Sequence, residues 1–112
     1  MAYVVNKSDL PSGDTFEGYL HNAAHVSFFL SETPPGRGPR LHTHPYEEVF
    51  IVQAGTLTFT VGTETVEVSG EKIVVVPAGT PHKFINSGTE IARHIDLHVN
   101  ERMVTEWLEN KH

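Results

Sequence analysis

Residues 36–55 read GRGPRLHTHPYEEVFIVQAG, a stretch in which three potential metal-binding side chains follow one another at short intervals. They are His42, His44 and Glu48. On an extended strand every second side chain points to the same face, so these three even-numbered residues can converge on one ion. A His-x-His pair alone is a weak signal, because surface histidines are common and this chain has 8 of them. The glutamate at matching parity strengthens the prediction of a metal site.

A second stretch supplies a fourth candidate ligand. Residues 77–86 read PAGTPHKFIN and contain His82 just after a turn rich in proline and glycine. If the strand that begins there lies beside the first, His82 reaches the same ion. Three imidazoles and one carboxylate suit a divalent transition metal, and Fe, Mn, Ni, Co and Zn all accept such ligands. We therefore predict one divalent transition metal ion held by His42, His44, Glu48 and His82.

The two stretches resemble the two motifs of the cupin family. Residues 36–55 match G-x5-H-x-H-x3-E-x6-G at every defined position, and residues 77–86 match the core of the second motif, P-x-G-x2-H-x3-N. The resemblance implies an all-β fold, a jelly-roll β-barrel, formed by a single cupin domain over residues 1–112.

One position departs from the family pattern. The interval from Gly70 to Pro77 is one residue longer than the interval between the leading glycine and the proline of the second motif. A one-residue bulge among residues 73–76 would absorb the difference; otherwise Gly70 is not the motif glycine.

Alternating apolar and polar residues between glycine-rich turns agree with an all-β fold. They predict strands over residues 24–31, 46–53, 56–61, 64–68, 73–76, 82–86 and 91–99. Residues 73–76 are apolar at every position, so we expect both of their faces to be covered.

The segment after the last predicted strand has the spacing of a helix. Met103, Val104, Trp107 and Leu108 fall on one helical face, and Asn100 is a suitable N-cap. We predict a short C-terminal α-helix over residues 101–110, packed on the barrel or on a second subunit.

The last predicted strand has an unusual polar face. His94, Asp96 and His98 alternate there with apolar residues. This face either points to solvent, lines the metal cavity or lies at a subunit contact. If it lines the cavity, His98 is the candidate catalytic acid or base and Asp96 a candidate for orienting a histidine. The candidate substrate-binding residues are Tyr46, Phe50 and Phe84, which share the strand face of the predicted ligands, and His94 from the polar face.

Composition narrows the possible partners. The chain has 112 residues, a formal net charge of -6 and no cysteine. An acidic chain without a basic patch argues against nucleic acid and against anionic membranes. The first ten residues do not resemble a secretory signal, and the apolar runs are too short to span a bilayer, so a cytoplasmic location is expected. A small chain with apolar surfaces favours a homodimer.

The cupin resemblance implies several functions that the fold does not distinguish. Our leading expectation is a metal-dependent enzyme acting on a small oxygenated organic molecule, with dioxygenase-type oxidation as the reaction. The alternatives are a non-catalytic module that binds a metal or a small ligand, and a metal-dependent isomerase or lyase. Each requires a small-molecule partner.

Overall fold

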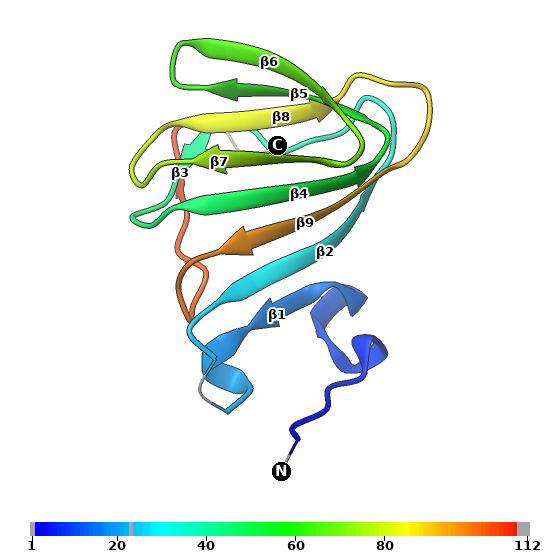
Figure 1. The fold of residues 1–112 in the computed structure, drawn as a ribbon. Helices are drawn as coiled ribbons and strands as arrows, with labels where there is room; N and C mark the ends of the chain where they lie inside the picture. The colour runs from blue at the N-terminus through cyan, green and yellow to red at the C-terminus, as the bar shows by residue number, and fades with distance from the viewer. Residues whose placement is uncertain (1, 23, 110–112) are drawn as a thin grey trace.

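Two five-stranded antiparallel sheets make up the fold in the computed structural model, which describes residues 2–22 and 24–109 (Figure 1). The strand orders are β1-β2-β9-β4-β7 in the first sheet and β10-β3-β8-β5-β6 in the second. The strands are β1 (Thr15–Glu17), β2 (Ser27–Thr33), β3 (His42–Thr43), β4 (Glu48–Ala54), β5 (Thr56–Val61), β6 (Glu64–Ser69), β7 (Lys72–Val76), β8 (His82–Asn86), β9 (Ala92–His98) and β10 (Glu106–Trp107). Three short 3-10 helices are η1 (Lys7–Asp9), η2 (Pro11–Gly13) and η3 (Gly18–Leu20).

This arrangement is the predicted jelly-roll β-barrel, and every predicted strand is present with small shifts at its ends. The order of the strands, with β9 between β2 and β4, places the last long strand in the middle of the first sheet. His82 of β8 and His94 and His98 of β9 therefore lie in different sheets and face one interior. No helix in the described part of the chain is long and apolar enough to cross a membrane.

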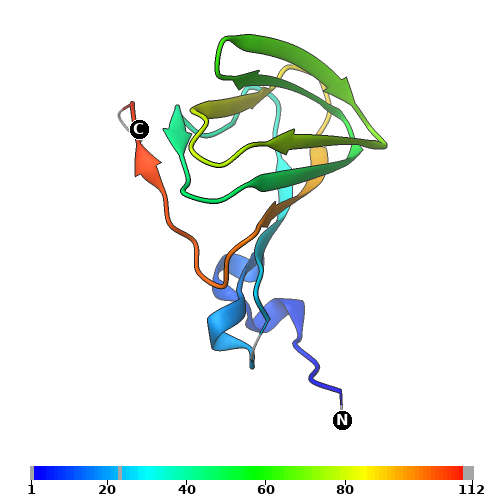
Figure 2. The same ribbon diagram turned by 60° about the vertical axis from the view of Figure 1, so that its left-hand side comes forward.

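The predicted C-terminal α-helix is wrong for the described residues 101–109. Instead β10 pairs with β3, with Trp107 opposite His42, and the backbone N–H of Leu108 donates to the carbonyl of Leu41 at 3.0 Å. A helix this short is marginal in water, whereas the open edge of β3 offers backbone partners. We call residues 100–109 the C-terminal strap; Figure 2 shows it in orange and red, rising beside β3.

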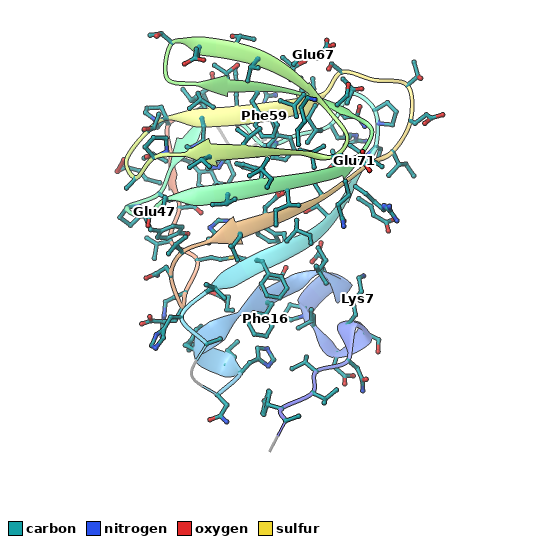
Figure 3. All side chains as sticks on the ribbon, in the orientation of Figure 1. Lys7, Phe16, Glu47, Phe59, Glu67 and Glu71 are labelled. Carbon is teal, nitrogen blue, oxygen red and sulfur yellow. The ribbon has the colours of Figure 1, made fainter. Side chains whose placement is uncertain are left out.

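The predicted bulge within residues 73–76 is also wrong, because β7 pairs with β4 in continuous register. The irregular residue is Glu71, which has a positive φ of 69° in the turn before β7 (Figure 3). Its N–H donates to the carbonyl of Val52 at 2.7 Å. A Cβ on Gly70 would lie 2.9 Å from the carbonyl oxygen of Gln53, so this close approach requires glycine.

The hydrophobic core fills the barrel on one side of the histidines. Its buried side chains are Phe50, Val52, Leu57, Phe59, Val68, Val76, Phe84 and Ala92. In the pairing of β5 with β8, Phe59 faces Phe84 and Val61 faces His82. The histidine layer is therefore the layer next to the core, toward the end of the barrel that the strap crosses.

The outer face of the first sheet is apolar as well. Side chains pointing away from the core form two rows across paired strands, Val75-Val49-Leu97-Phe28-Phe16 and Ile73-Ile51-Ile95-Leu30. We call these residues the outer apolar face. Ile73 is 66% exposed and Val75 60%, so the prediction that both faces of residues 73–76 are covered is wrong for the single chain.

Candidate metal centre

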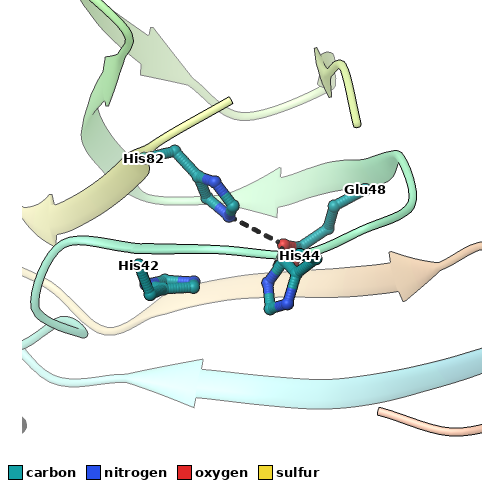
Figure 4. Close-up of side chains that lie close together, drawn as sticks. All are labelled: His42, His44, Glu48 and His82. Carbon is teal, nitrogen blue, oxygen red and sulfur yellow. Dashed lines mark hydrogen bonds and ion pairs between the residues drawn. The ribbon is translucent and has the colours of Figure 1, made fainter. Parts of the chain in front are cut away.

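The four predicted ligands come together inside the barrel (Figure 4). Their ligand atoms all lie within 4.8 Å of one another, and all four side chains are buried. His42 and His82 are directly opposed on β3 and β8, and Glu48 begins β4. His44 lies in the connection between β3 and β4, where its carbonyl accepts a hydrogen bond of 2.8 Å from the N–H of Gly79. That bond ties the turn before His82 to the first motif.

Each of the three histidines is held from behind by a backbone carbonyl. The contacts are His42 Nδ1 to Arg40 O at 2.6 Å, His44 Nδ1 to Val104 O at 2.8 Å, and His82 Nδ1 to Thr80 O at 2.8 Å. Because a carbonyl only accepts, Nδ1 carries the proton in every case and Nε2 is turned toward the centre. The Nε2 of His82 is hydrogen-bonded to Glu48 Oε1 at 3.0 Å, a contact that a metal ion would replace. The three Nε2 atoms are thus prepared as ligands in the way that protein metal sites commonly prepare them.

Burial and neighbouring groups shift the pKa values of His42 and Glu48 in the direction that metal binding requires. Burial lowers the pKa of His42 to about 4, so its imidazole is neutral near pH 7. Burial alone would raise the pKa of Glu48, but the imidazoles of His44, His82 and His98 outweigh it and hold this pKa well below its usual range. An ionised carboxylate faced by several imidazole nitrogens forms a donor set for a cation.

The buried polar atoms give a second indication of a metal. His44 Nε2 lies 3.1 Å from Glu48 Oε1, and His98 Nε2 lies 3.2 Å from Glu48 Oε2, yet neither nitrogen is aligned for a hydrogen bond. A buried polar group without a partner costs about 1–3 kcal/mol. A divalent cation among the four ligands would occupy the lone pair of His44, so these residues fit a transition metal ion.

A cavity of about 240 Å³ adjoins the ligands. Its lining residues are Phe29, Pro39, His42, His44, Glu48, Phe50, Phe84, Asp96, His98, Thr105 and Trp107. Phe50 and Phe84, both candidate substrate contacts, are among them, whereas Tyr46 and His94 are not. A larger surface groove of about 390 Å³, along residues 36–40 and Lys83, contains none of the four ligands, so we place the chemistry in the smaller cavity.

Tyr46 lies behind the imidazoles instead of beside the cavity. Its hydroxyl is 2.6 Å from His98 Nδ1 and accepts a hydrogen bond of 3.0 Å from the N–H of Val104. Burial raises the pKa of Tyr46 to about 12, so the hydroxyl keeps its proton. Tyr46 therefore joins His98 to the C-terminal strap.

The polar face of β9 points into the barrel, because His94, Asp96 and His98 are all at most 4% exposed. Asp96 and His98 reach the cavity. His94 lies behind Asp96, with Nδ1 bonded to Asp96 Oδ1 and Nε2 2.8 Å from Thr33 Oγ1. Of the three arrangements that the sequence left open, the interior one is observed.

Sequence reasoning missed several residues of the cavity wall, namely Phe29, Pro39, Thr105 and Trp107. The ring of Trp107 lies 5.0 Å from the ring of His42. Strand parity does indicate Phe29, which shares the inward face of β2 with Ser27. No local signal indicates Trp107, because its place depends on the pairing of β10 with a distant strand.

A family model described as a cupin domain matches residues 29–98. The chain belongs to the cupin family. Similar solved structures include an oxalate oxidase in complex with glycolate (19% identity, TM-score 0.74), covering 85% of this chain and 53% of that chain. The oxalate decarboxylase of Lactobacillus farciminis in complex with formate has 22% identity and a TM-score of 0.77, covering 84% of this chain and 30% of that one. The Cnp3 cupin domain of Schizosaccharomyces pombe has 20% identity and a TM-score of 0.65, covering 70% and 58%.

A curated relative shares only part of the sequence. An uncharacterized protein of Streptomyces coelicolor is 46% identical over 41 residues, which are 37% of this chain and 39% of that protein. Identities below 25% to the solved structures establish the shared fold and no more.

Removing one ligand histidine should sharply reduce the metal content of the purified protein. We expect His42→Ala and His82→Ala each to lower metal affinity by at least the roughly 10–100-fold typical of lost supporting contacts. His25→Ala, which changes an exposed histidine, is the matched control and should keep the wild-type content. The measurement is mass-spectrometric metal analysis of protein prepared without an affinity tag; unchanged stoichiometry in both ligand variants would refute the assignment.

Proposed function

We propose that this cupin is a metal-dependent enzyme that oxidises a small oxygenated organic molecule with dioxygen. The observation that carries the proposal is the cavity beside His42, His44, Glu48 and His82, with Asp96 and His98 also in its wall. Four protein ligands leave two positions of an octahedral shell for other molecules. A redox-active metal bound there would supply electron transfer between an organic molecule and dioxygen.

The size of the cavity supports a small substrate. Its volume of about 240 Å³ lies below the roughly 300–1,000 Å³ typical of sites for drug-sized ligands. The oxalate oxidase and the oxalate decarboxylase with the same fold were solved with glycolate and formate, which are both small oxygenated acids. These comparisons support the class of substrate by analogy, since the fold is shared by proteins with different chemistries.

We assign acid–base chemistry to His98. Its ring reaches the cavity beside Glu48, and its Nδ1 is hydrogen-bonded to the hydroxyl of Tyr46. That bond fixes the orientation of the ring, which leaves Nε2 directed toward the centre, 3.2 Å from Glu48 Oε2. His98 can therefore hold or release a proton next to a molecule bound in the cavity.

Oxygen uptake tests the proposed reaction. Protein loaded anaerobically with Fe²⁺, Mn²⁺ or Zn²⁺ is mixed with small hydroxy acids, dicarboxylic acids, diketones and phenols, and dioxygen is followed with an electrode. We expect uptake that requires both an organic substrate and a redox-active metal, with none in the zinc form or in His42→Ala. Ligand binding without uptake would favour a binding module, and conversion by the zinc form without dioxygen would favour an isomerase or lyase.

Replacing His98 should impair turnover more than metal binding. His98→Gln should lower the turnover number by about 10²–10⁴-fold, which is the usual contribution of a positioned acid or base, while metal content stays at the wild-type level. Steady-state kinetics and metal analysis on the same preparations check this. Wild-type turnover in His98→Gln would exclude the proton-transfer role.

We also propose that two copies of the chain associate through the outer apolar face. This face runs over all five strands of the first sheet, and its edge residues Ile73 and Val75 are mostly exposed. Continuous apolar surface of this extent is unfavourable in water. A two-fold dimer would cover the same face on both copies at once.

Light scattering at micromolar concentration tests this association. We expect the wild type to have the mass of a dimer and Ile73→Lys to shift toward the monomer, because a charge would be buried without a partner. Ile85→Lys, which changes an exposed apolar residue on the other sheet, is the matched control and should remain dimeric. A wild type with the mass of the monomer contradicts the proposal.

A further inference from the structure

A carboxyl group lies in an otherwise aromatic layer of the barrel. Asp96 is paired across the first sheet with Phe29 on one side and Phe50 on the other, and Phe84 completes the wall from the second sheet. Asp96 is only 4% exposed. A carboxyl group in such surroundings is unfavourable unless its oxygens have partners.

One oxygen of Asp96 has such a partner and the other does not. Oδ1 is bonded to Nδ1 of His94, and Nε2 of that ring is held by the hydroxyl of Thr33 at 2.8 Å. Oδ2 makes no hydrogen bond with any residue in the described part of the chain, and Asp96 lines the cavity. The hydrogen bonds that link Thr33, His94 and Asp96 thus hold the carboxyl group in place, and its second oxygen is available to a molecule in the cavity.

Asp96 and the metal ligands lie in different layers of the barrel, so a molecule that contacts both must span the distance between the layers. His98 is paired with Glu48 in the metal layer, and Asp96 is paired with Phe50 two residues further along each strand. At about 3.4 Å per residue, the two layers are about 7 Å apart. The cavity therefore has a metal-binding end and a carboxyl end, with phenylalanine side chains in its wall.

We propose that Asp96 is the second anchor of the substrate and binds its protonated amino group, while oxygens at the other end of the substrate reach the metal. The inference rests on the proposed metal-dependent function and narrows its substrate to a small amine that also carries chelating oxygens, long enough to reach two layers about 7 Å apart. A fixed carboxylate oxygen is a strong acceptor for an ammonium N–H, and a bound cation would offset the burial that raises the pKa of Asp96. Aromatic rings add to the attraction where the cation lies over their faces.

Two probes of the same shape test the proposal on the zinc-loaded protein without dioxygen. 4-(Aminomethyl)catechol and 4-ethylcatechol share the chelating oxygens and differ only in the terminal atom of the side chain. Binding is measured by calorimetry and by the fluorescence of Trp107, which is the single tryptophan of the chain and lines the cavity. We expect the amine to bind at least about tenfold more tightly, as for a hydrogen bond between charged groups.

Variants then test whether Asp96 is the residue that makes the amine probe bind more tightly. Asp96→Asn keeps the shape and an oxygen for His94 but loses the charge, so the ratio of the two affinities should fall to about one while metal content stays unchanged. Asp9→Asn, a change at an exposed carboxylate, should keep the preference. Equal affinities of the wild type for the two probes would overturn this inference alone, and the same holds if Asp96→Asn retains the preference. Failure of the zinc form to bind either catechol would also overturn this inference alone, whereas failure of the wild type to bind metal would overturn the proposed function together with it.

Discussion

The buried carboxylate of Glu48 is the group around which the centre is organised. A carboxylate inside a barrel is strongly unfavourable unless neighbouring groups compensate for its lost hydration. Here His82 in one sheet is hydrogen-bonded to Oε1, while His44 in a connection and His98 in the other sheet face the carboxylate at 3.1 and 3.2 Å. Glu48 thus joins both sheets at one end of the barrel. Because removal of any partner would leave charge or polarity uncompensated, the contacts that hold this end together also bring the metal ligands into position.

The interior of the barrel is divided into layers by the two-residue repeat of its strands. Phe59 and Phe84 face each other in the apolar core, whereas His82 lies one step further along β8. Apolar packing therefore fixes the strands directly beside the polar centre. The ligand residues on these strands are held in position by the same packing. A centre built on paired strands needs less reorganisation to bind a cation than one built on free loops.

Local sequence signals predicted the longer strands and, together with the cupin resemblance, the ligands, whereas the short strands β1, β3 and β10 were not predicted. Alternation defined β5, and the parity of His42, His44 and Glu48 defined the donor set. The C-terminal helix failed because the apolar spacing of residues 101–108 suits a helix locally, whereas the deciding partner, the edge of β3, lies about 60 residues earlier. The sequence likewise could not predict that Asp96 points inward. Alternation along a strand divides its side chains between two faces, but it does not show which face the second sheet covers.

The strap explains why the end of the chain belongs to the site. The Val104 carbonyl accepts the Nδ1 proton of His44, and Trp107 closes the cavity beside His42. Most of the other cavity walls are interior side chains of paired strands, and Pro39 and His44 line it from the segments flanking β3. The strap is held by the pairing of β10 with β3, by backbone hydrogen bonds to Leu41, and by hydrogen bonds of Met103 N–H to Glu17 and Val104 N–H to Tyr46. Because the Val104 carbonyl also orients the ring of His44, displacement of the strap would remove a group that positions a metal ligand.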